Sequence, residues 1–205
     1  MAQLDNFKKR ERTSVANQIA AFGTRLATAA RLSNIPVHLA ETFEVWKLQP
    51  KALTGRGQRL AKVARFTGYW QHVIRHGGEP EEIAWSAREN ATGKWKVHSI
   101  GTTVLARNLG EAIKYLDEND HSDALVRILL VPVFGLHALW LFFKEEDRVV
   151  LFEAMRPVPG LTLKKIYSGK DFLSAIAKQA KHLPRVAQLT KPPRKPRPRS
   201  PFKRS

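Results

Sequence analysis

The feature that most restricts the fold is a nearly unbroken apolar run, ILLVPVFGLHALWLFF, at residues 128–143. The run is shorter than the roughly 20 residues that a membrane-spanning helix needs, and Pro132 and Gly135 interrupt it. We therefore expect no transmembrane segment here, but two strands joined by a tight connection. Because strands that are apolar at consecutive positions are covered on both faces, these two strands should lie in the centre of a sheet that carries helices.

Three helices are predicted before residue 78. Apolar residues recur at helical spacing between Val15 and Leu26, which indicates an amphipathic helix that begins near Phe7. A second helix is predicted at residues 36–50, where Pro36 occupies the first helical position. A third is predicted at residues 58–76, ended by the two glycines that follow.

Alternating patterns after residue 78 predict strands, which place the chain in the α+β class. From residue 58 onward the predicted order is α-β-β-α-β-β-β-α, a helix-flanked, mainly antiparallel five-stranded sheet that follows the N-terminal helices. A hairpin turn is expected at residues 90–93 and a polar turn at residues 144–147. The predicted strands are residues 82–89, 94–100, 125–131, 137–143 and 148–152, and the predicted helices after the hairpin are residues 105–118 and 170–182.

Positive charge is concentrated at the two ends of the chain. The net charge is +17 over 205 residues. Residues 1–77 hold 13 Lys/Arg against 4 Asp/Glu, residues 78–183 hold 14 of each, and residues 184–205 hold 8 Lys/Arg and no acidic residue. Six prolines in the last segment exclude helix and central strand. We therefore predict a basic N-terminal helical region at 1–57, an α+β core domain at 58–183, and a disordered Pro/Arg-rich tail at 184–205.

No pattern in the sequence predicts catalysis. The chain has no cysteine, which excludes disulfides, thiolate zinc sites and cysteine nucleophiles. His72 and His76 are four residues apart on the predicted third helix, but the expected base of an HExxH site is absent and Arg75 would repel a cation. No serine lies in a nucleophile elbow. The prediction is a non-enzymatic protein without a metal or a cofactor.

The excess of positive charge predicts a nucleic-acid-binding accessory protein. Lys and Arg without a base-reading module indicate mainly phosphate contacts to DNA or RNA, with low sequence specificity. The glycines of residues 54–57 could bring backbone amides together before a helix, although an ordinary connector fits this segment as well. Each tryptophan is expected in the core, including Trp95, for which base stacking is the alternative. The predicted contact residues are Lys8, Lys9, Arg10, Arg12, Arg56, Arg59, Lys62, Arg65, Arg75, Lys191, Arg194, Lys195, Arg197, Arg199, Lys203 and Arg204.

A different class of function fits the same charge distribution. The neutral middle could bind a protein partner, acidic or a second copy of the chain, while the basic tail acts as a targeting or secretion signal. An enzyme that acts on a phosphate-bearing substrate is the third possibility. A cytoplasmic location is the expectation for the first reading. If His72 and His76 contact phosphate, binding should strengthen as the pH falls through the histidine pKa of about 6.5.

Overall fold

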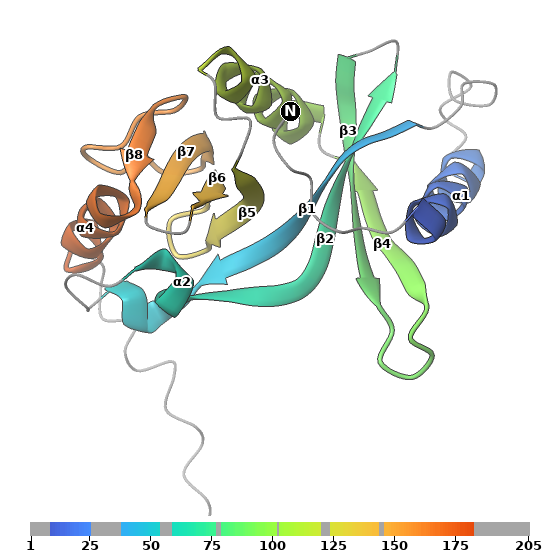
Figure 1. Ribbon diagram of the computed structural model, residues 1–205, viewed down its shortest axis with the longest axis horizontal. Helices are drawn as coiled ribbons and strands as arrows, with labels where there is room; N and C mark the ends of the chain where they lie inside the picture. Colours follow the sequence, from blue (N-terminus) through green and yellow to red (C-terminus); the bar gives the residue numbers. More distant parts are fainter. Residues whose placement is uncertain are drawn as a thin grey trace, which may run out of the picture.

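The computed structural model describes residues 9–25, 38–53, 59–76, 79–101, 103–119, 124–143 and 146–182. These residues form one eight-stranded sheet with helices on both of its faces (Figure 1). The strand order is β4-β3-β2-β1-β5-β6-β7-β8. The strands are β1 (His38–Leu48), β2 (Ala64–His76), β3 (Glu79–Arg88), β4 (Trp95–Gly101), β5 (Leu125–Val131), β6 (Leu136–Phe142), β7 (Asp147–Ala154) and β8 (Ile166–Ser168). The helices are α1 (Lys9–Arg25), the 3₁₀ turn η1 (Pro50–Leu53), α2 (Leu60–Val63), α3 (Thr103–Glu118) and α4 (Gly169–Ala180).

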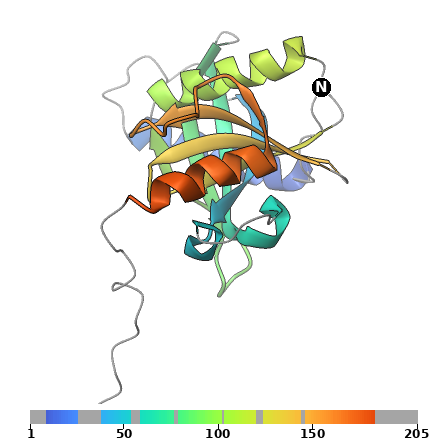
Figure 2. The ribbon, with the colours of Figure 1, turned by 90° about the vertical axis from the view of Figure 1, so that its left-hand side faces the viewer.

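The sheet is built from the same succession of elements twice. Strands β1 to β4 are joined by antiparallel pairing and followed by α3, and strands β5 to β8 are paired in the same way and followed by α4. The two halves meet where β1 and β5 run parallel in the middle of the sheet. A rotation about an axis along these parallel strands exchanges the two faces, so α3 and α4 lie on opposite sides of the sheet (Figure 2).

Three apolar clusters follow this layout. On the first face, α3 packs on strands of both halves through residues such as Leu109, Phe43 and Phe152. On the opposite face, α4, η1 and α2 cover β6 and β7 around Trp140. On that same face, but over β2, β3 and β4, α1 contributes Val15 and Ile19. The central part of the second face therefore lies between α1 and α4.

The second and third predicted helices are wrong, because residues 38–48 and 64–76 form the strands β1 and β2. The sheet has eight strands rather than the five predicted. The predicted order of helices and strands is therefore also wrong. In β1, Phe43 and Val45 point to the α3 cluster while Trp46 lies on the other face, the alternation of a strand. In β2, Val73 and Ile74 are both buried because both faces of the strand are covered there. Two adjacent apolar residues fit the pattern of a helix as well as that of a strand buried on both faces, so the sequence did not distinguish the two.

The predictions for the rest of the sheet are confirmed in outline. The structure contains the hairpin of β3 and β4, helix α3, strands β5, β6 and β7, and helix α4. The apolar run forms β6 and most of β5, both buried on two faces. Strand β8 was not predicted, since three residues are too few to show a period. Among the described residues no helix is long and apolar enough to span a membrane. The proposed boundaries at residues 57 and 183 and the basic tail lie outside the described residues.

Candidate nucleic-acid interface

The first half of β2 is an open strand edge in the described part of the chain. Pairing between β2 and β3 begins at Tyr69↔Ala87, so residues 64–66 pair with β1 alone. A bulge at Thr67 and Gly68 changes the direction of the strand: Gly68 has a φ of 84°, and the Thr67 hydroxyl donates to the Val45 carbonyl at 2.7 Å. Figure 1 shows this part of β2 curving away from β3 toward α2. The open edge therefore lies between the two halves of the sheet.

Two exposed cations lie at this edge, and a third lies on α2, just before β2 in the chain. Lys47 on β1 and Arg65 on β2 are direct cross-strand partners, and Lys62 on α2 lies three residues before Arg65. In the part of the chain that the structure describes, none of the three has an acidic partner. Like charges directly opposite each other destabilise a strand pair by roughly 0.2–1 kcal/mol. We call Lys47, Lys62 and Arg65 the cation cluster.

Two exposed aromatic rings accompany the cation cluster. Phe66 is 42% exposed and Tyr69 is 40% exposed, and they are the two largest exposed rings among the described residues. Successive side chains of a strand alternate between faces: Phe66 is paired with Trp46 on one face, whereas Tyr69 contacts the His98 ring on the other, with centroids 5.5 Å apart. Residues 65, 66, 68 and 69 are exposed, so among the described residues no helix covers either face of this part of β2.

Phe66 is the exposed middle of a six-ring ladder that crosses the second face of the sheet. Neighbouring ring centroids are 5.5–6.3 Å apart, and most neighbours meet edge to face. One end packs on the α1 cluster and the other on the α4 cluster. The members, in order across the sheet, are Trp95, Trp70, Phe66, Trp46, Trp140 and Phe142.

Two arginines lie against this aromatic ladder. The Arg127 guanidinium is 4.6 Å from the centroid of the Trp46 ring and also lies over Trp140. Its Nε atom donates to Glu44 Oε2 at 3.1 Å, and the Trp46 indole donates to the same carboxylate oxygen at 2.8 Å. Arg88 lies 5.2 Å from the Trp95 ring centroid. Both guanidinium groups therefore make cation–π contacts, which are worth about 0.5–1 kcal/mol at exposed sites.

The structure separates the arginines that the predicted third helix would have placed together. Arg65 is exposed at the open edge, but Arg75 lies ten residues further along β2 and pairs with Glu41 at 2.7 Å. Arg59 lies 4.0 Å from the buried carboxylate of Asp147. Because residues 64–76 form a strand rather than the predicted helix, Arg65 and Arg75 do not share one helix face.

The other predicted contact residues are only partly described. Arg10 is exposed on α1 and Arg12 is half-buried, and Lys9 begins the same helix. Lys8, Arg56, the glycine-rich loop at 54–57 and all the tail positions lie outside the described residues. Of the predicted residues, Lys62 and Arg65 belong to the cation cluster, and the structure places Arg65 directly opposite Lys47.

His72 is buried in the sheet and does not reach the surface. Its Nδ1 atom lies 3.1 Å from the Thr42 hydroxyl and its Nε2 atom 2.7 Å from the Ser86 hydroxyl. Burial, with a smaller contribution from the positive charge of Arg12, lowers the pKa of His72 from 6.5 to about 3. A neutral, hydrogen-bonded imidazole in this position is a structural group, so His72 is not a phosphate contact. Among the described residues no cluster of three metal-ligating side chains occurs.

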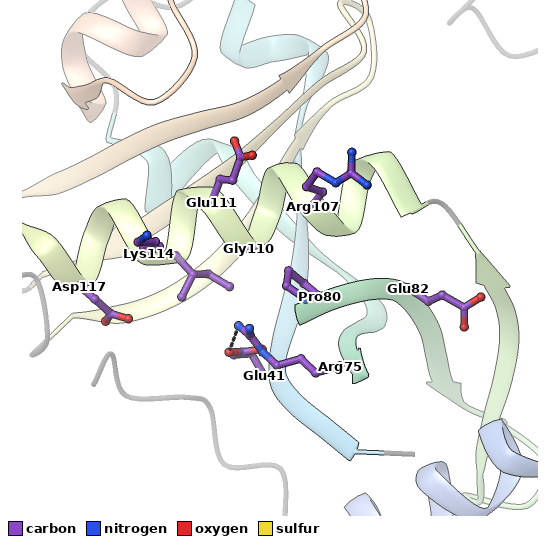
Figure 3. Close-up of a pocket in the computed structure, with 10 residues that line it drawn as sticks. Glu41, Arg75, Pro80, Glu82, Arg107, Gly110, Glu111, Lys114 and Asp117 are labelled. Atoms are coloured by element: carbon purple, nitrogen blue, oxygen red, sulfur yellow. Dashed lines mark hydrogen bonds and ion pairs between the residues drawn. The ribbon is translucent and has the colours of Figure 1, made fainter. Parts of the chain in front are cut away.

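A wide groove of about 840 Å³ lies between α3 and the ends of β1, β2 and β3 (Figure 3). Both signs of charge line it, and the Glu41–Arg75 ion pair crosses its floor. Pro80 packs directly on Gly110 of α3, where a Cβ atom would lie 2.3 Å from the Pro80 ring. Four acidic and three basic side chains line it, so the groove has no net positive charge to attract a polyanion, unlike the cation cluster.

Sequence reasoning missed Lys47, Phe66 and Tyr69 as surface residues. The helix predicted at residues 36–50 contains Lys47, and the helix predicted at residues 58–76 contains Phe66 and Tyr69. The available signal is the segment KVARFTGY at residues 62–69, in which pairs of small or β-branched residues separate the cations and rings. Trp95 is half-buried in the ladder, in agreement with the prediction that it packs rather than stands free. Comparisons of this chain with protein-family models, curated proteins and solved structures gave no match.

Proposed function

We propose that this protein binds nucleic acid through phosphate contacts made by the cation cluster, with low sequence specificity. The observation that carries the proposal is the direct pairing of Lys47 with Arg65, both exposed and without an acidic partner in the described residues. This repulsion costs stability in the free protein and is relieved by an anion. A polymer of phosphates supplies anions at a spacing that several cations engage at once.

The charge of the whole chain supports the same proposal. A net charge of +17 attracts a polyanion over a distance and speeds association. The Pro/Arg-rich segment 184–205 adds eight positive charges without an acidic residue, and these strengthen binding without reading bases. No enzymatic step is part of the proposal.

The test is a double substitution, Lys47→Gln with Arg65→Gln, and a matched control with the same change of charge on α4, Lys170→Gln with Lys178→Gln. Binding of a labelled single-stranded oligonucleotide is measured by fluorescence anisotropy over a range of salt concentrations. Loss of two phosphate contacts should make the log–log salt slope shallower by about 1.4, at ~0.7 per contact for single strands. The control should keep its slope.

The same variant has a second readout, its stability. Because the repulsion between two cross-strand cations is removed, its free energy of unfolding should stay unchanged or rise by up to about 1 kcal/mol. Weaker binding in a variant that is no less stable supports a binding role. An unchanged salt slope, or a purified protein that instead retains one polypeptide at high salt, would contradict the proposal.

A further inference from the structure

Phe66 is a large apolar residue that is exposed on the surface of the sheet. Its side chain is 42% exposed in the middle of the sheet, and it is the most exposed member of the ladder. The rings on either side, Trp46 and Trp70, are half-buried and lie 5.8 and 6.3 Å from it, centroid to centroid. The neighbouring cation Arg65 precedes it in the strand. Because successive side chains of a strand alternate between faces, Arg65 and its partner Lys47 point away from the Phe66 face, so the exposed ring and the proposed phosphate contacts lie on the two sides of the same open strand edge.

We propose that unpaired bases stack on Phe66 and the adjoining parts of Trp46 and Trp70, so that the ligand of this site is a single-stranded nucleic acid. This inference rests on the proposed function and names the form of its ligand. Every base has a π-face, so stacking on aromatic rings binds a single strand without reading its sequence. Within a duplex the base faces are covered by their neighbours, and the ladder has nothing to stack on.

The spacing of the ladder supports a single strand. Its ring-to-ring distances of 5.5–6.3 Å exceed the ~3.4 Å rise per nucleotide of a stacked strand. Bases that follow the ladder are therefore drawn apart from one another, which a flexible single strand allows and a duplex resists. The exposed cations Lys47 and Arg65, on the other side of the same open edge, make a polyanion the complementary occupant.

The opposite side of the strand provides a matched control. Tyr69 lies on the same strand and is as exposed as Phe66, at 40% against 42%, but it contacts His98 and is not part of the ladder. If the ladder face binds bases, Phe66→Ala should weaken binding and Tyr69→Ala should not. Phe66→Tyr, which keeps a ring, should restore it. Phe66→Leu keeps an apolar side chain and shows whether a loss follows from the missing ring or from altered folding.

The experiment measures the affinity of the full chain for three labelled probes by anisotropy. The probes are an oligothymidine of about 20 nucleotides, longer than common single-strand site sizes of ~4–16 nucleotides, an abasic strand of equal length, and a duplex of equal length. We expect the oligothymidine to bind about tenfold tighter than the abasic strand, as for one stacked base. Phe66→Ala and Phe66→Leu should remove this advantage while the affinity for the abasic strand stays the same.

The outcomes separate the two proposals. Equal binding of oligothymidine and abasic strand, with both weakened by the double substitution of Lys47 and Arg65, would leave the phosphate contacts standing and overturn base stacking. Tighter binding of the duplex, or equal losses in the Phe66→Ala and Tyr69→Ala variants, would overturn it as well. Failure of all three probes to bind would overturn both proposals.

Discussion

The burial of His72 predicts a loss of stability in mild acid. The folded protein holds this imidazole neutral, with a pKa of about 3, whereas the unfolded chain binds a proton below a pKa of about 6.5. Its contribution to stability is therefore present above pH 6.5 and is lost as the pH falls from there toward 3. At pH 5 the difference in protonation costs roughly 2 kcal/mol relative to pH 7.5, at about 1.4 kcal/mol per pH unit.

The assay is urea unfolding followed by circular dichroism at pH 7.5 and pH 5, where most carboxylates are still ionised. The variant His72→Gln can keep hydrogen bonds to Thr42 and Ser86 but does not titrate in this range. His137 also has a lowered pKa, because of burial, and it contributes to the fall in both proteins. The difference between wild type and variant isolates His72. If the wild type lost no more stability than the variant between the two pH values, the reasoning would be refuted.

Three further predictions concern packing and charge. Gly110→Ala should lower the melting temperature, since a Cβ atom would lie 2.3 Å from Pro80. The overpacking cost of about 1–3 kcal/mol exceeds the ~1 kcal/mol gained in helix propensity. A more stable variant would show that the contact between α3 and β3 is looser than described. Trp140→Phe removes the indole that donates to the buried Asp147 carboxylate at 3.1 Å. Chemical denaturation should therefore show a free energy of unfolding lower by about 1–3 kcal/mol. An unchanged midpoint would count against this hydrogen bond. Deletion of residues 184–205, with their eight positive charges, should make the salt slope of nucleic-acid binding shallower. The shortened protein should still melt in one cooperative transition. An unchanged slope would show that the tail does not contact the nucleic acid.

The second half of the sheet could be predicted from the sequence because its pattern has one physical solution. Residues 125–131 and the apolar run after them are too short for a membrane span and are interrupted by Pro132 and Gly135, and β5 and β6 follow. The hairpin of β3 and β4 has Gly93 at a φ of 64° in its turn, a conformation that glycine adopts without strain. The polar residues 144–147 likewise predict a break between two strands, and β6 ends at Phe142 and β7 begins at Asp147.

The first half could not be predicted because β1 and β2 are covered differently along their length. In β2, residues 71–74 are buried on both faces, and residues 65, 66 and 69 are exposed on both. Neither stretch alternates in the way that marks a half-buried strand. A buried histidine and a buried glutamine in β2 also depart from the expected pattern, since His72 is satisfied by hydroxyl groups on β1 and β3 that are distant in sequence.

Only part of the candidate site could be predicted from the sequence, because its residues are brought together by strand pairing. Its cations are few, and the strongest charge signal in the sequence is at the ends of the chain. Lys47 and Arg65 are 18 positions apart, and only the register between β1 and β2 makes them neighbours. The six rings of the ladder come from β1, β2, β4 and β6. These strands are distant in sequence, so no local motif predicts the ladder.

The most direct test of nucleic-acid binding at this surface is the set of indole N–H signals in a two-dimensional NMR spectrum. The chain has five tryptophans; Trp46 and Trp70 flank Phe66 in the ladder, whereas Trp85 packs against the α3 cluster on the opposite face. Titration with an oligothymidine should shift the signals of Trp46 and Trp70 and leave that of Trp85 in place. A spectrum in which Trp85 alone moves, or in which no indole signal moves at saturating oligonucleotide, would contradict the account.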